Sequence, residues 1–192
     1  LDLLYKEDVA HESVSRETWP NPVTLDIPNF DPKDPAASYP QVFSRTYHGR
    51  RKEGFDYLEK EIAGRDPSYG YSVLAQILAG TRHNVVVTTN FDNLVIDALS
   101  IYTNATPLIC GHESLAGFIR TKPSRPQVVK VHRDLFYAPK NTTDELGALP
   151  SQFAEALRTL FASHVPIVIG YGGNDGSLMR VFEEMAPGTL SQ

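Results

Sequence analysis

Cysteine is almost missing from this chain, which has a single one, Cys110, among 192 residues. One cysteine excludes a disulfide framework within the chain and leaves too few thiolates for a cysteine-based zinc site. Cys110 ends the apolar run at residues 107–110, so we expect it to be a buried strand residue rather than a reactive thiol. No metal site is expected.

Long apolar runs and an excess of positive charge are also lacking. No run approaches the length of a membrane span, and the first residues have no signal-peptide pattern. A net charge of −5 gives no general attraction to nucleic acid or to anionic lipid. We therefore expect a cytoplasmic protein that has no membrane partner and does not bind nucleic acid directly.

What the chain does have is the composition of an ordinary globular protein, with 41% hydrophobic and 21% charged residues. Its length suffices for one domain with a sizeable core. From Trp19 to Pro40 the chain is rich in proline, which predicts an extended or turn-rich segment. Leu1–Tyr5 resembles the end of an amphipathic helix.

Helical and strand patterns alternate through the rest of the chain. This alternation predicts an α/β fold, a Rossmann-like open parallel sheet with right-handed crossovers and helices on both faces. The hydrophobic spacing predicts helices at residues 41–47, 55–62, 71–80, 93–102, 151–163 and 177–185, and a short helix after residues 111–114. Buried strands are predicted from Val85 and at residues 107–110, 127–134 and 165–170.

Three of these predicted strands end abruptly in polar groups. The first runs into Thr88–Asp92, the second into His132 and Asp134, and the third into the glycine-rich loop Gly170–Gly176. The carboxyl ends of parallel strands meet at one edge of a sheet, where open α/β sheets bind their ligands. The conjunction predicts a shared ligand crevice.

Each signal also has a structural interpretation. Asn90 and Asp92 could form a turn and cap the following helix, and His132 could be a satisfied structural residue. The Gly170–Gly176 loop could be a tight strand-to-helix turn, or its backbone amides could bind a phosphate or ribose. It has neither the GxGxxG spacing nor a Walker lysine.

Three motifs, Thr88-Thr-Asn-Phe-Asp92, Lys130-Val-His132 and Ile169-Gly-Tyr-Gly-Gly-Asn-Asp175, occur in the order and at the spacing seen in sirtuins. From about Tyr39 to its end, the chain resembles the sirtuin family, in particular the sirtuin-like NAD hydrolase domains of bacterial antiphage defence proteins. The resemblance implies a sirtuin-type NAD-binding fold.

The resemblance also implies roles for individual residues. Asn90 and Asp92 would contact the nicotinamide ribose and order a water, His132 would act as a base, and the glycine loop would lie against the phosphates and ribose of NAD+. The residues implied in binding NAD+ are Thr88, Thr89, Asn90, Asp92, Gly170, Tyr171, Gly172, Asn174 and Asp175.

The chain departs from the sirtuin pattern at several places. Thr89 stands where sirtuins have glutamine, and Arg133 where they usually have glycine. Residues 133–166 contain no cysteine, whereas protein-deacylating sirtuins carry a four-cysteine zinc ribbon in this interval. The family also opens with a strand and a glycine-rich loop, which nothing before Trp19 matches. We therefore expect residues 1–192 to be a single NAD-binding domain belonging to a longer multidomain chain.

The expected function is hydrolysis of NAD+ to nicotinamide and ADP-ribose, with NAD+ as substrate and no metal. The resemblance further implies an effector role in antiviral defence, held inactive until a homo-oligomer, a partner protein or an attached domain signals infection. The alternatives are a non-catalytic module that senses NAD or ADP-ribose, an NAD-dependent protein deacylase, and a structural α/β domain that docks a partner.

Overall fold

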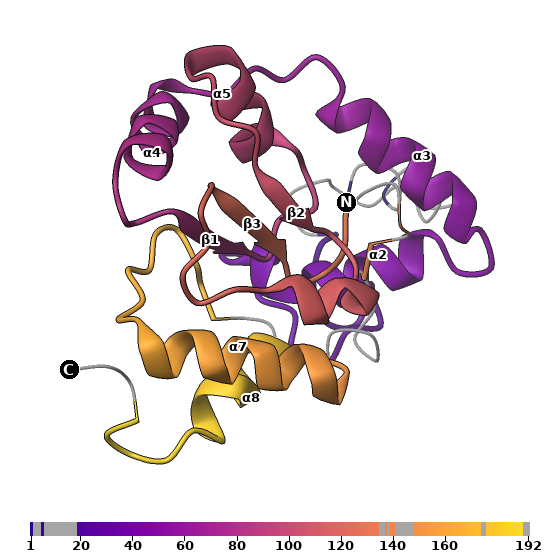
Figure 1. Ribbon diagram of the computed structural model, residues 1–192. Coiled ribbons are helices and arrows are strands. Elements are labelled where there is room, and N and C mark those ends of the chain that lie inside the picture. The colour runs from indigo at the N-terminus through magenta and orange to yellow at the C-terminus, as the bar shows by residue number, and fades with distance from the viewer. Residues whose placement is uncertain are drawn as a thin grey trace.

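The computed structural model describes residues 1, 5, 19–134, 137, 139–140, 148–173 and 176–189. The predicted helical tail at Leu1–Tyr5 lies largely outside the described residues. Within them helices and strands alternate as predicted from Tyr69 to Ser163, and the chain is built around one small sheet (Figure 1).

The sheet has three parallel strands in the order β1-β3-β2. Their bounds are β1 (Val85–Thr88), β2 (Leu108–Cys110) and β3 (Gln127–Lys130). β3 is the central strand, with Val86 opposite Val128 on one side and Ile109 opposite the same residue on the other. All four residues of β3 are buried, as expected of a central strand with helices on both faces, although only Val128 and Val129 among them are apolar.

Helices cover both faces of this sheet, as predicted (Figure 1). On one face lie α4 (Tyr69–Gly80) and α5 (Leu94–Tyr102), which pack on Val128. On the other lie η2 (Glu113–Phe118), α7 (Ser151–Ser163) and α8 (Gly176–Glu183), which pack on Val129 and Val131. The structure is a Rossmann-like open α/β fold. None of the helices in the described parts of the chain has the length and apolar character needed to cross a membrane.

The proline-rich stretch after Trp19 is turn-rich, as predicted, and forms a small apolar cluster of its own. It leads into η1 (Pro35–Ser38), α2 (Tyr39–Thr46) and α3 (Arg51–Ile62). Helices α2 and α3 meet at Gly54, where a Cβ atom would lie 2.8 Å from the Phe43 ring. The apolar cluster comprises Trp19, Leu25, Ile27 and Phe30.

The predicted buried strand at residues 165–170 is wrong. These residues belong to no strand, and the side chains of Ile167 and Ile169 are each 80% exposed. A β-branched run favours extended backbone, but a strand also needs a neighbour whose amides and carbonyls it can pair with. The three-stranded sheet of the described residues offers this segment no such pairing, and Pro166 lacks a donor.

The end of β3 also differs from the prediction. The strand stops at Lys130 rather than continuing to Asp134, because the chain turns sharply at Arg133. Cys110 is confirmed as a buried residue of β2, and burial raises the pKa of its thiol, as expected of an unreactive cysteine.

Candidate functional site

The site lies at the carboxyl edge of the sheet, where β1 and β3 end side by side. Thr88 and Lys130 are register partners, and beyond them the backbone N–H of Val131 donates to the carbonyl of Thr88 at 2.8 Å. The two polar strand ends predicted to share a crevice therefore leave the sheet together. The residues they carry include Asn90, Asp92, His132 and Asp134.

The turn after β1 is held by its own side chains. Thr88 Oγ1 accepts a hydrogen bond from the backbone N–H of Asn90 at 3.1 Å, and Asp92 Oδ1 accepts from the N–H of Leu94 at 3.0 Å. Asp92 thus stabilises the first turn of α5, which supports the structural interpretation for this carboxylate. The Asn90 side chain is exposed and Thr89 is partly buried, so Asn90 faces outward from this edge.

His132 follows β3 and is only 6% exposed. Its carbonyl accepts a hydrogen bond from the N–H of Lys140 at 3.0 Å. The next residue, Arg133, has a φ of 69°, in the left-handed region that favours glycine. This backbone conformation gives a physical reason for glycine at the corresponding position of sirtuins.

An ion pair compensates for the unfavourable conformation of Arg133. Its Nε donates to Glu113 Oε2 at 2.7 Å and its Nη2 donates to Glu113 Oε1, so the contact is bidentate. The Arg133 guanidinium lowers the pKa of Glu113 to about 2. Since Glu113 begins η2, this pair joins the turn after β2 to the turn after β3.

A buried lysine lies between the strand ends. The side chain of Lys130 is 1% exposed, and its Nζ donates to Asp134 Oδ2 at 2.6 Å, Asn93 Oδ1 at 2.6 Å and the carbonyl of Phe91 at 3.0 Å. An ammonium has three protons, so these acceptors satisfy it fully. Asp134 is fixed in turn, since its N–H donates to the carbonyl of Gly111 at 2.7 Å.

The sequence motifs contained Lys130 but gave no role to it, to Asn93 or to Glu113. The signal for Lys130 was a charged residue within a run of valines, at a position that a central strand must bury. A buried charge requires a partner, and Asp134 is a carboxylate four residues further along the chain. Glu113 and Arg133 are twenty positions apart in the sequence, and no local pattern predicts that they pair.

The glycine loop is the third predicted wall of the site. Gly170 and Gly173 have φ values of 64° and 72°, so both occupy the left-handed region that glycine adopts without strain. Tyr171 packs against the apolar cluster formed by β3, α7 and α8, while Gly172 is exposed. Asn174 and Asp175 lie outside the described residues. The binding role of this loop remains a prediction.

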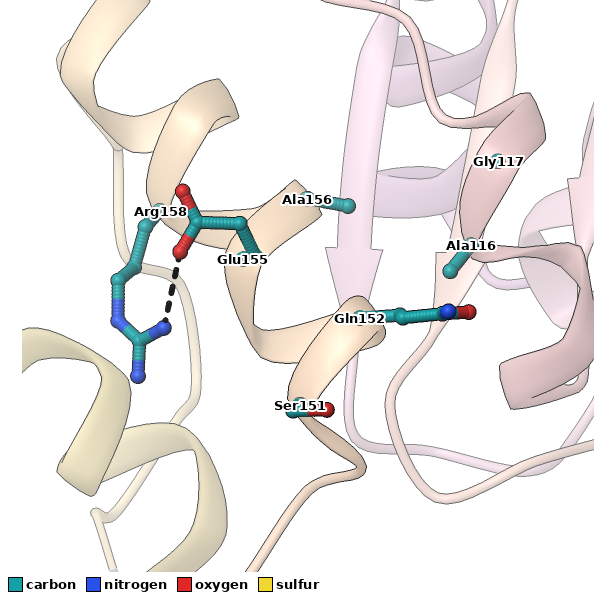
Figure 2. Close-up of a pocket in the computed structure, with 7 residues that line it drawn as sticks. All are labelled: Ala116, Gly117, Ser151, Gln152, Glu155, Ala156 and Arg158. Carbon is teal, nitrogen blue, oxygen red and sulfur yellow. Dashed lines mark hydrogen bonds and ion pairs between the residues drawn. The ribbon is translucent and has the colours of Figure 1, made fainter.

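A shallow hollow lies elsewhere on the described surface. It has a volume of about 640 Å³ and lies between η2 and the first turns of α7. Figure 2 shows that Ala116 faces it from η2 and that Gln152 reaches toward it from α7, while Arg158 bonds Glu155 along the helix. Its lining combines small side chains with Ser151, Gln152 and the paired Glu155 and Arg158, and it includes none of the motif residues, so we place the candidate site at the strand ends.

Within the parts of the chain that the structure describes, no group of three or more histidine, cysteine, aspartate or glutamate side chains is arranged to hold a metal ion. Four charged residues near the strand ends form two ion pairs, Lys130 with Asp134 and Arg133 with Glu113.

The fold and the site define a class of protein: an open parallel α/β domain with polar side chains gathered at the carboxyl ends of its strands. Residues 84–189, more than half of the chain, match the SIR2-like domain family, and the chain belongs to this family. The matched region includes all three motifs quoted above. Membership supports an NAD-related function. No curated protein matches the chain.

Proposed function

We propose that this domain hydrolyses the bond between nicotinamide and ribose in NAD+. The observation that carries the proposal is the meeting of the Thr88–Asn93 turn with the His132 turn at one edge of the sheet, in a chain of the SIR2-like family. The exposed amide of Asn90 and the partly buried hydroxyl of Thr89 suit the hydroxyl groups of a ribose. The glycine loop offers backbone amides for the phosphates.

The reaction requires the protein mainly to position the ribose and a water molecule. Nicotinamide in NAD+ is a cationic leaving group, so it departs with the electrons of the glycosidic bond and needs no general acid. The transition state has oxocarbenium character, as in other glycoside cleavage. A water then adds its oxygen to the ribose C1′ and gives up a proton. We assign the ordering of this water to Asn90 and acceptance of the proton to His132, with Asp92 holding the turn beneath them.

The test is nicotinamide release from NAD+ by the full-length protein, followed by chromatography. We expect His132→Ala and Asn90→Ala each to reduce the rate by about 100-fold or more, as is typical when a catalytic or positioning group is lost. The matched controls are His83→Ala and Asn104→Ala, which change exposed residues outside the strand-end site. Full activity in both site variants would remove the assignment.

One observation favours a second candidate, a module that binds NAD or ADP-ribose without turnover. Asp92 Oδ1 is already engaged by the N–H of Leu94, and His132 is largely buried, so both could serve the fold alone. If the domain is a sensor, binding of the nucleotide should raise the melting temperature of the protein, and no nicotinamide should be released. Protein deacylation is the weaker alternative, because the chain has no four cysteines with which to build a zinc ribbon.

We also propose, from the resemblance of the motifs alone, that the domain serves as the effector of a bacterial antiviral defence protein. A free NAD+ hydrolase would deplete its own cell, so activity would depend on oligomerisation or on a partner or attached domain that detects infection. The measurement is cellular NAD+ during phage challenge, in cells carrying the wild-type protein or His132→Ala. Equal NAD+ loss in both would overturn this role.

A further inference from the structure

Lys130 is an unusual residue for the middle of a sheet. It ends the central strand β3, with a side chain that is 1% exposed, in a position that valine or isoleucine would fill at lower cost. A buried ammonium is retained only where its charge is paired and its protons are used. Here each proton has an acceptor within 3.0 Å.

The three acceptors lie on the two segments that carry the proposed reactive residues. The Phe91 carbonyl and Asn93 Oδ1 belong to the turn after β1. In the sequence, these two residues flank Asp92 and follow Asn90. Asp134 Oδ2 belongs to the turn after β3, two residues beyond His132. One side chain therefore joins the two turns.

The anchor at Asp134 is itself rigid. Its N–H bonds the carbonyl of Gly111 at 2.7 Å, and a Cβ atom on Gly111 would lie 3.1 Å from the Cβ of Asp134. The end of β2 is thus packed closely against the residue that receives the Lys130 ammonium. Movement of one turn relative to the other would break charge-assisted bonds to an ammonium whose side chain is 1% exposed, where water has little access to replace them.

We propose that Lys130 is a positioning residue that fixes the separation of Asn90 from His132. This inference rests on the proposed function, because it assigns the geometry of that same site. A displacement of about 1 Å in a catalytic group can cost about 100-fold in rate. Lys130 bonds both turns and therefore limits such a displacement, whereas a residue that only packs in the core does not.

The decisive variant is the double substitution Lys130→Met with Asp134→Leu in the full-length protein. Replacing both partners of a buried pair by apolar groups of similar shape often leaves stability almost unchanged, whereas removing one partner does not. The double variant therefore removes the tether without leaving a buried charge. Gln127→Met is the matched control, since Gln127 is buried at the other end of β3 and bonds the backbone of Arg120 there.

Two readouts separate a positioning role from a structural one. We expect the double variant to lower kcat for nicotinamide release by about 100-fold at a temperature where it is fully folded, and Gln127→Met to change it less than about threefold. We also expect amide hydrogen exchange to quicken in peptides covering residues 88–94 in the double variant and not in the control. A third variant, Asn93→Ala, keeps the Lys130 charge paired with Asp134 and so costs less stability than the loss of either charge. It should show the same two changes in smaller measure.

The outcomes are distinct. A folded double variant with wild-type kcat and wild-type exchange at residues 88–94 overturns the positioning role while leaving the proposed function intact. Should the double variant not fold, wild-type values of both readouts in Asn93→Ala overturn it instead. If the wild-type protein releases no nicotinamide, the proposed function fails, and the exchange measurement alone decides whether Lys130 holds the two turns together.

Discussion

Substitution of Glu113 by glutamine gives a prediction whose size can be worked from the structure. The pKa of this carboxyl is held at about 2, against an ordinary value of 4.5, chiefly by its hydrogen bonds with Arg133. Such a lowering corresponds to at most about 3 kcal/mol of stabilisation of the charged form. The two side chains are 21% and 25% exposed, so solvent screens part of it, and we expect Glu113→Gln to cost about 1–2 kcal/mol at neutral pH.

The dependence on pH follows from the direction of the shift. A carboxyl whose pKa is lower in the folded state stabilises the protein fully above its unfolded pKa, near 4.5, and this stabilisation is lost as the pH falls toward 2. The free energy of unfolding of the wild type should therefore approach that of the variant between about pH 4.5 and pH 2.

Urea denaturation followed by circular dichroism, at neutral pH and at steps down to about pH 2, measures this difference. Glu59→Gln is the control, because Glu59 is an exposed residue of α3. It should change the free energy of unfolding by less than about 0.5 kcal/mol at neutral pH. A difference between wild type and Glu113→Gln that stays constant across the acidic range would refute the reasoning.

Three further predictions concern stability, each read as the free energy of unfolding. Arg133→Gly should be more stable than Arg133→Ala by about 1 kcal/mol, since both lose the ion pair but only glycine accepts a φ of 69° without strain; equal stabilities would contradict this. Gly54→Ala should destabilise the protein by about 1–3 kcal/mol, because the new Cβ would lie 2.8 Å from the Phe43 ring. Gly70→Ala is its control: the nearest atom to the new Cβ lies 3.9 Å away, so this change should be neutral or stabilise by up to about 1 kcal/mol. Leu157→Ala should cost about 2–5 kcal/mol, because Leu157 is fully buried in the core between α7 and the sheet, and a loss below about 1 kcal/mol would place it outside that core.

The sequence predicted the layers of this fold well because they depend on local periodicity. The helix at Ser151–Ser163 was correct at both ends, since apolar residues at helical spacing and a preceding proline define it. The strands from Val85 and at the end of the 107–110 run were also correct in place and in kind. A parallel arrangement followed from the helices between them.

What the sequence could not supply was the identity of partners. Residues 165–170 have the composition of a buried strand, but composition does not say whether a neighbouring strand is present, and here the segment is unpaired with the sheet. The hydrogen bonds of Lys130 could not be predicted for the same reason. Their acceptors come from two turns that meet only in the folded protein. The motifs predicted which strand ends would lie at one edge of the sheet, and tertiary contacts determine how those strand ends are held together.

The exposed run from Val165 to Ile169 has a consequence for the behaviour of this polypeptide in solution. Its side chains are between 62% and 80% exposed at Val165, Ile167, Val168 and Ile169, and these four residues are β-branched and uncharged. Pro166 interrupts the run, but the exposed apolar side chains form a surface on which copies of the chain can associate, so we expect self-association at high protein concentration before the domain unfolds. Replacing Ile167 by lysine would introduce a gatekeeper charge. Light scattering should then detect aggregates at a higher protein concentration, with the melting temperature almost unchanged.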